Sequence, residues 1–285
     1  MGWCKFVRVG KNQLVPLFYC LYILICQVLH IKNLTYIKIN YLCIMTLASQ
    51  IQIQIMKFPE GETFGYADLK IDKKDFYSVA KSLERLQKKG TIKKVSKGVF
   101  YVPRKTIFGE VGPDSSSILD RYLFKNGKRI AYETGYSLFN SLGLTTQMAF
   151  KIKIATKNNP IKINTGTLQV SSVKSYVEVT NKNYKLLGYL DALKEIKNIP
   201  DCSVSQAITR MSYLIKDLTP KEQNDIIKYA LYYPPRTIGL LGAILENSNL
   251  NMNLTELQNK LNPLTKIKLN IKETELPTIK NWNIE

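Results

Sequence analysis

Residues 71–103 constrain the fold most, because they predict a basic amphipathic helix that ends at a glycine and leads directly into a hairpin. Five apolar residues recur at spacings of three and four, as in a helix that buries one face: Phe76, Val79, Ala80, Leu83 and Leu86. Asp72 is expected to cap the helix start, and Ile71 with Phe76 to form a hydrophobic staple. Gly90 is expected to end the helix in a left-handed conformation.

A hairpin should follow this helix. Residues 91–95 and 99–102 are strand-like runs, and the Ser-Lys-Gly at 96–98 is a turn signal between them. A basic helix followed by a hairpin is the order that a winged helix-turn-helix uses, with the helix in a DNA groove and the wing on the phosphates. Residues 70–105 also hold twelve Lys or Arg against three acids, which is typical of nucleic-acid binding.

Candidate DNA-binding side chains lie off the apolar stripe and on the wing. They are charged or small hydrogen-bonding residues, suited to phosphates and base edges. On the helix they are Lys74, Tyr77, Ser78, Lys81, Ser82 and Arg85, and on the wing Lys93, Lys94 and Lys97. The alternative is a solvated helix and hairpin in a Lys-rich protein, since most charge runs are solvated surfaces.

Composition sets wider limits. A chain of 285 residues can form one large or two modest domains, and a hydrophobic content of 45% is enough for a real core. The net charge of +19 and the pI near 9.6 indicate an acidic partner, of which double-stranded DNA is the first candidate.

Residues 1–44 differ from the rest and form a separate N-terminal extension. They hold no Asp or Glu, four of the five cysteines and the only histidine. The apolar run at 14–29 could belong to a signal peptide, but no small-residue cleavage site follows it. Its sixteen residues fall short of the roughly 20 that a membrane anchor needs. The favoured interpretation is an untranslated segment with a start at Met45, and hence a cytoplasmic protein that does not bind membranes.

Few catalytic options remain from Met45 onward. That part has no histidine, which excludes Ser-His and Cys-His pairs, and its single cysteine, Cys202, cannot form a disulfide within it. No glycine-rich phosphate loop occurs. A magnesium-dependent nuclease would need acids and a lysine such as Asp114, Glu195 and Lys197, but Asp114 and Glu195 lie 81 residues apart. No enzymatic activity, cofactor or metal is therefore expected.

The expected fold class is α+β, with an N-terminal winged helix-turn-helix at 45–103 and a mixed α/β C-terminal domain at 104–247 that ends in helices. Residues 46–57 are expected to form the first helix, although 50–55 also alternate like a strand. Further helices are expected at 64–69, 71–89, 115–124, 131–141, 184–197, 203–216, 220–231 and from 235. Strands are expected at 150–156, 161–163, 167–172 and 176–179, a linker at 103–113, and a partly loose tail at 248–285.

Two motifs behind the wing resemble a known family. These are Phe-Gly-Glu-Val-Gly-Pro-Asp at 108–114 and Leu-Gly-Leu-Thr-Thr-Gln at 142–147. Together with the DNA-binding segment they resemble the AbiEi-type antitoxins of type IV toxin–antitoxin systems. The Tyr-Pro-Pro-Arg at 233–236, leading into 240–246, looks like the end of an AbiEi C-terminal region. The resemblance covers residues 45–247.

The resemblance implies a repressor in two parts. Its winged helix-turn-helix would bind inverted repeats in its own promoter, and its C-terminal domain would help to neutralise a nucleotidyltransferase toxin (AbiEii-like) without needing a stable complex. The setting would be phage defence by abortive infection. The alternatives are a winged-helix regulator whose C-terminal domain binds a ligand or protein without a toxin partner, and the magnesium-dependent nuclease. The motif at 142–147 also has a simpler interpretation, as core leucines around a glycine turn with a polar cap.

Overall fold

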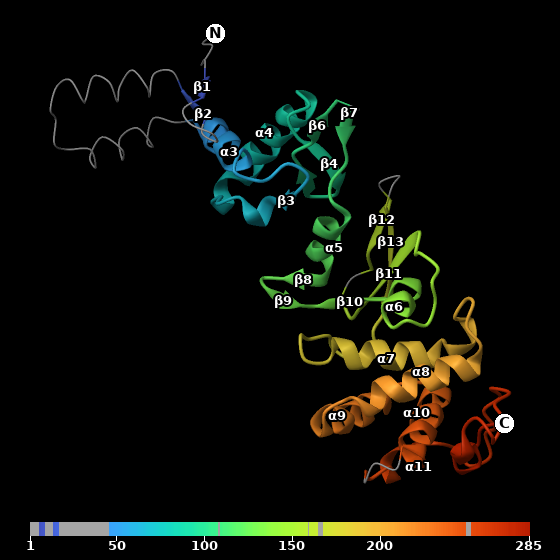
Figure 1. Ribbon diagram of the computed structural model, residues 1–285. Helices are drawn as coiled ribbons and strands as arrows, with labels where there is room; N and C mark the ends of the chain where they lie inside the picture. The colour runs from blue at the N-terminus through green and yellow to red at the C-terminus, as the bar shows by residue number, and fades with distance from the viewer. Residues whose placement is uncertain are drawn as a thin grey trace. The chain divides into compact units, whose positions relative to one another are not determined.

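The computed structural model describes residues 6–8, 14–16, 46–107, 109–158, 160–164, 168–248 and 252–285 (Figure 1). The chain divides into two compact units, Met1–Lys57 with Leu69–Lys88, and Phe58–Asp68 with Lys89–Glu285. Apart from Leu14–Pro16, the apolar run at 14–29 lies outside the described residues. Within the described part, no helix has the length and apolar character that a membrane span requires.

The first unit pairs two helices. Besides a short antiparallel pair of strands, β1 (Phe6–Arg8) and β2 (Leu14–Pro16), it contains α3 (Leu47–Ile55) and α4 (Phe76–Lys88), which pack on each other. The expected helix at 46–57 is confirmed, because the Thr46 side chain accepts a hydrogen bond from the Ser49 amide and Ile51 and Ile55 are buried. In α4 the buried apolar residues are Val79, Leu83 and Leu86.

The start of the predicted recognition helix differs from the expectation. A 3₁₀ turn, η2 (Lys73–Asp75), precedes α4, so α-helical geometry begins at Phe76 and not at residue 71. The Asp72 carboxylate makes no capping hydrogen bond and instead lies 3.6 Å from the Lys74 ammonium. Phe76 is 53% exposed, so it does not belong to the buried stripe. Gly90 adopts the expected left-handed conformation, with φ of 72°.

The second unit begins with a three-stranded antiparallel sheet. Its order is β3 (Thr63–Gly65), β5 (Val99–Tyr101), β4 (Lys93–Ser96), and the predicted hairpin turns at Gly98, where φ is 77°. The helix expected at 64–69 is wrong, because Thr63–Gly65 pairs with β5 and only the 3₁₀ turn η1 (Tyr66–Asp68) follows. Phe64 is fully buried and stacks on the Phe58 and Phe100 rings at 4.9 and 6.0 Å between centroids, which favours the strand.

The prediction of a linker at 103–113 is also wrong, since most of this segment forms a hairpin. Strands β6 (Arg104–Thr106) and β7 (Gly109–Val111) pair antiparallel, and the Thr106 hydroxyl donates a hydrogen bond to the Gly109 carbonyl at 2.8 Å. Gly109 has φ of 110°, a conformation that permits the tight turn between β6 and β7. Helix α5 (Ser115–Leu123) follows as expected.

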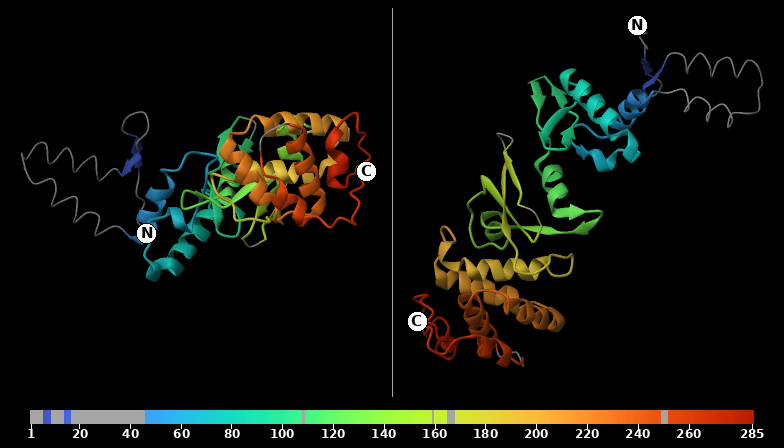
Figure 2. Two further views of the ribbon diagram at one scale, coloured as in Figure 1. Left: turned by 90° about the horizontal axis from the view of Figure 1, so that it is seen from below. Right: turned by 180° about the vertical axis from the view of Figure 1, so that it is seen from behind.

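A mixed sheet of four strands forms the middle of this unit (Figure 2). Its order is β10 (Ala131–Thr134), β11 (Lys151–Thr156), β13 (Gln169–Lys174), β12 (Lys162–Asn164), with only β11 and β13 parallel. Helix α5 buries Ile118 and Leu119 in one cluster with Ile154 and Val170. The prediction of a helix at 131–141 is wrong for its first half, which forms strand β10, and correct for its second half, the short helix α6 (Tyr136–Ser141). Gly135, with φ of 68°, separates the two elements. The strand expected at 176–179 is absent from these described residues.

A layer of helices packs against β10. It consists of α7 (Tyr184–Lys194), the 3₁₀ turn η3 (Ile196–Asn198), α8 (Val204–Lys216), α9 (Pro220–Ala230) and α10 (Pro235–Asn247), close to the expected positions. Ser203 with Gln206 and Thr219 with Glu222 form capping boxes that fix two of the helix starts. Nine residues of α10 are buried, which makes it the central helix of this layer.

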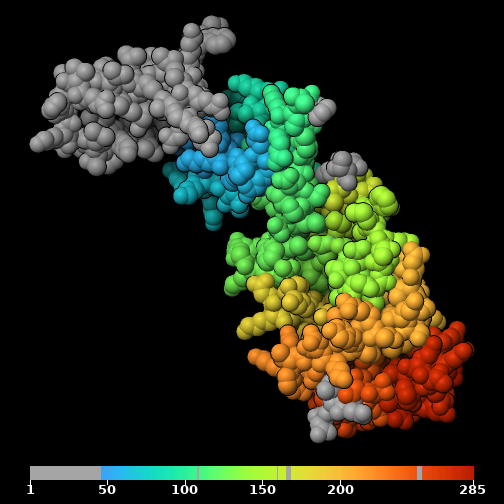
Figure 3. Space-filling view, viewed as in Figure 1, coloured from blue at the N-terminus to red at the C-terminus, as the bar shows by residue number. Residues whose placement is uncertain are grey.

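Residues 252–285 are not loose but complete the core. They contain α11 (Thr255–Lys260) and the 3₁₀ helix η4 (Pro277–Trp282), which lies along α10 and is drawn in red in Figure 3. Trp282 is fully buried against Gly242 of α10, and its indole N–H donates a hydrogen bond to Glu246 at 2.5 Å. The expectation of a separate tail fails because these apolar side chains share the helical core.

Gly242→Ala should destabilise the protein through this contact. A Cβ at residue 242 would lie 2.2 Å from the Trp282 ring, and the ring is too enclosed to move away. Overpacking typically costs about 1–3 kcal/mol, which exceeds the gain of roughly 1 kcal/mol from helix propensity. Urea denaturation should therefore show a lower midpoint. Gly112→Ala is the control, because nothing lies within 4 Å of its added Cβ. Equal midpoints for the two variants would contradict this packing.

Candidate nucleic-acid interface

Five of the predicted DNA-binding residues form one exposed surface of the first unit. Lys74, in η2, and Tyr77, Ser78, Lys81 and Arg85, in α4, are all exposed and follow one another at spacings of three and four. We call these five residues the helix surface. Tyr77 is 70% exposed, and the Lys81 ammonium lies 4.7 Å from the centre of its ring, a cation–π arrangement. The helix surface therefore combines positive charge, hydrogen-bond donors and an exposed aromatic ring.

Ser82 does not belong to this surface. It is 8% exposed, and its hydroxyl donates a hydrogen bond to the Ser78 carbonyl one turn earlier at 2.9 Å. A small hydroxyl can be buried in a helix when it bonds to the backbone in this way. The prediction that Ser82 faces outward is wrong for this reason.

Two of the three cations of the helix surface keep a positive charge unpaired by any described residue, whereas Lys74 pairs with Asp72. In the part of the chain that the structure describes, neither Lys81 nor Arg85 forms an ion pair with a carboxylate. The only acid within α4, Glu84, pairs with Lys88 at 2.9 Å, and this hydrogen bond lowers the pKa of Glu84. Arg85 and Lys88 also lie in the last turn, where the helix dipole favours cations.

The three predicted wing lysines, in the second unit, are not equivalent. Lys94 and Lys97 are exposed, Lys94 on β4 and Lys97 in the turn. Lys93 instead forms a short hydrogen bond and ion pair with Glu110 of β7. This contact raises the pKa of Lys93 and lowers the pKa of Glu110, so both remain charged at neutral pH. Lys93 would have to leave Glu110 in order to contact a phosphate.

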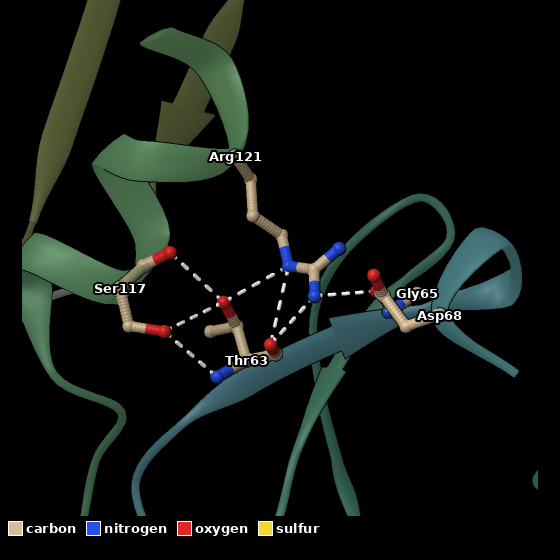
Figure 4. Close-up of polar contacts among 5 residues, drawn as sticks. All are labelled: Thr63, Gly65, Asp68, Ser117 and Arg121. Atoms are coloured by element: carbon tan, nitrogen blue, oxygen red, sulfur yellow. Dashed lines mark hydrogen bonds and ion pairs between the residues drawn. The ribbon is translucent and has the colours of Figure 1, made fainter. Parts of the chain in front are cut away.

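A polar cluster that was not predicted joins the wing sheet to α5 (Figure 4). The Thr63 amide donates to the Ser117 hydroxyl at 2.8 Å, and the Thr63 hydroxyl donates to the Ser117 carbonyl at 2.9 Å. Arg121 donates twice to the Thr63 carbonyl, through Nε at 3.2 Å and Nη2 at 2.7 Å, and pairs with Asp68 at 2.5 Å. Asp68 in turn accepts from the Gly65 amide at 2.7 Å. We call these five residues the clamp; no sequence motif indicates it.

The close approach at Gly65 explains why a glycine occupies this strand. A Cβ there would lie 2.9 Å from the carbonyl oxygen of Gly98, on the turn of the wing. Backbone cannot give way as a flexible side chain could, so only glycine allows β3 and the wing turn to approach this closely.

An acidic cleft of about 570 Å³ lies beside the clamp. Its lining includes Arg104 and Arg121 but also five carboxylates, those of Glu60, Glu62, Asp68, Asp114 and Asp120. A cleft with this excess of negative charge would repel DNA phosphates. Asp114, considered above for a nuclease, lines it, whereas Glu195 and Lys197 do not. Among the described residues, no group of three or more His, Cys, Asp or Glu is arranged to hold a metal ion.

Two of the three motifs that suggested a family, those at 142–147 and 233–236, have structural roles. In the motif at 142–147, Leu144 is buried, Gly143 is left-handed with φ of 71°, and the Leu142 carbonyl accepts from Arg210 at 2.8 Å. Gln147 donates to Asp201 at 2.7 Å. In the motif at 233–236, Tyr233 is buried and the two prolines begin α10. Both motifs therefore shape the core, and Phe108 of the third motif lies outside the described residues.

Comparison with known proteins identifies the family of this chain. The model of the family DUF6088, a family of unknown function, matches residues 50–227. The chain belongs to this family. The matched region spans the helix surface, the hairpin at 93–101, the clamp and the mixed sheet. No curated protein matches the chain.

Arg121→Ala should destabilise the protein through the loss of the clamp. The change removes the guanidinium donors from Thr63 and the partner of Asp68. Hydrogen bonds to charged groups are worth about 1.5–3 kcal/mol, so we expect a loss of roughly 2 kcal/mol in the free energy of unfolding. Arg121→Lys should recover only part of it, because an ammonium cannot reproduce the planar fork. Arg236→Ala, at an exposed position, is the control. An Arg121→Ala protein as stable as that control would show that the clamp contributes nothing.

Proposed function

We propose that the protein is a winged helix-turn-helix repressor that binds double-stranded DNA at its own promoter, and that it acts as the antitoxin of a type IV, AbiE-like toxin–antitoxin system. On this proposal it is not an enzyme and it works in the cytoplasm. Its functional partner is a nucleotidyltransferase toxin (AbiEii-like), with which it need not form a stable complex, and the setting is phage defence by abortive infection.

The helix surface is the observation that carries the DNA-binding part of the proposal. It places Lys81 and Arg85 on one exposed side of α4, beside the ring of Tyr77 and without a neutralising ion pair among the described residues. Arginine and lysine in this setting bind phosphates and guanine edges, and tyrosine and serine can donate to phosphates. Nucleic acid is the polyanion that such a surface suits best.

The order of the elements supports a winged helix. Helix α3, strand β3, the 3₁₀ turns η1 and η2, helix α4 and strands β4 and β5 follow one another in the chain, and the strands pair in the order β3-β5-β4. A recognition helix that is followed at once by a two-stranded wing is the arrangement this DNA-binding fold uses. The exposed lysines of the wing, Lys94 and Lys97, have the charge that a phosphate contact requires.

The antitoxin part of the proposal rests on the resemblance of residues 108–114, 142–147 and 233–236 to AbiEi antitoxins. Co-expression with the neighbouring gene tests it. The neighbouring gene alone should arrest growth if it encodes the toxin, and growth should return when this protein is produced from a separate promoter. Promoter binding without any rescue of growth would instead indicate a winged-helix regulator without a toxin partner.

Arg85→Ala and Lys81→Ala should weaken binding to duplex DNA from the region upstream of the gene. A residue that contacts a base edge should cost about 1–3 kcal/mol and relax the sequence preference, whereas a residue that contacts a phosphate should weaken all sequences alike. Gel-shift titrations on the upstream duplex and on a scrambled duplex separate the two effects. Lys221→Ala, an exposed lysine of α9, is the control. If both helix variants bind like the control, the helix surface is not the recognition surface.

A further inference from the structure

A second concentration of positive charge occurs far from the wing in the sequence, on the hairpin formed by β8 (Phe124–Lys125) and β9 (Lys128–Arg129). Lys125 and Lys128 are direct cross-strand partners, and both are exposed. Asn126 and Gly127 form the two-residue turn with φ of 51° and 72°, the type of turn that holds a hairpin rigidly. Like charges directly opposite each other destabilise a strand pair, so folding alone does not account for this choice of residues.

Arg129 fixes this hairpin against α7. Its guanidinium lies 4.4 Å from the centre of the Phe124 ring and 4.1 Å from the centre of the Tyr184 ring, and Nη1 donates to the Ala131 carbonyl at 3.4 Å. Its Nε is buried without a hydrogen-bond partner. Stacking on aromatic rings orients a guanidinium without neutralising its charge.

Among the described residues, no carboxylate balances the three cations of the hairpin, Lys125, Lys128 and Arg129. Within the described ranges, neither Arg129 nor Lys125 nor Lys128 takes part in an ion pair. Tyr184 is the first residue of α7, and the side chain of Asn183 before it makes no capping hydrogen bond to that helix. The helix dipole therefore adds positive potential next to the hairpin, which borders the first turn of α7 in Figures 1 and 3.

We propose that the β8–β9 hairpin is a second, sequence-independent contact to the phosphate backbone of duplex DNA, in addition to the helix surface. This inference rests on the proposed DNA-binding function. Two lysines and an oriented arginine match the charge and hydrogen-bonding needs of neighbouring phosphates, and contacts to phosphates carry no sequence information. Among anionic partners DNA is favoured because the whole chain, at +19, suits a polyanion better than the mixed surface of a protein.

The double variant Lys125→Gln with Lys128→Gln tests this contact in the full-length protein. The slope of log K against log salt is negative, and each lost phosphate contact should make it less steep by about 0.9, so the double variant should be less steep by about 1.8. The loss of affinity should be equal on the upstream duplex and on the scrambled duplex, because no base is read. Thermal stability should stay equal or rise, since the change removes a like-charge pair. The control is Lys216→Gln with Lys221→Gln, which removes the same charge from exposed positions on α8 and α9.

Four outcomes would overturn the inference. An unchanged salt slope in the double variant, with the helix variants still impaired, would refute the hairpin contact and leave the proposed function intact. An equal drop in the control would show a general effect of charge. An unchanged slope with loss of growth rescue would assign the hairpin to a protein partner. If the unmodified protein binds neither duplex, the proposed function and the hairpin contact fail together.

Discussion

The two hydrogen bonds from the Arg121 guanidinium to the Thr63 carbonyl hold together two segments that the chain separates by 58 residues. Strand β3 has three residues and β5 as its single neighbour in the sheet, so these bonds and those between Thr63 and Ser117 supply the support that a second strand would give. The same guanidinium holds Asp68, which closes the turn at Gly65. The geometry of the wing turn at Gly98 therefore depends on a residue of α5, well outside the expected DNA-binding region.

A second polar contact joins the mixed sheet to the helical layer. The buried Asp191 carboxylate of α7 accepts from the Tyr132 hydroxyl at 2.9 Å and from the Thr134 hydroxyl at 2.8 Å, and Lys194 lies 3.4 Å away. Burial raises the pKa values of Tyr132 and of nearby Tyr233, so both hydroxyls keep their protons and remain donors. A buried carboxylate is tolerated only when its partners are satisfied in this way, and the requirement fixes how β10 meets α7.

Local signals explain which parts of the fold could be predicted. The periodicity of Val79, Leu83 and Leu86, and the glycines at 90 and 98, correctly gave helix α4 and the hairpin after it. Strand β3 was missed because its three residues do not separate a strand from a short helix, and the β6–β7 hairpin because Pro and Gly cluster around it as in a linker. The end of the chain could have been recognised, since Ile267, Leu269 and Ile271 alternate with polar residues and all are buried.

The candidate surface followed from helical spacing, except for Ser82, whose burial depends on neighbouring elements. The clamp has no local signal at all, because its members meet only in the folded chain.

Glu110 already binds Lys93 of the wing, so it would compete with a DNA phosphate for the Lys93 ammonium. A phosphate that approaches Lys93 must displace a carboxylate already held by the same ammonium, and the released carboxylate then repels it. The free energy gained at Lys93 is therefore the difference between the free energies of two ion pairs, that with the phosphate and that with Glu110. This difference is smaller than the free energy of either ion pair alone. On the proposed function, such a wing would limit residence time on DNA, and a bound repressor would exchange quickly when its concentration in the cell falls.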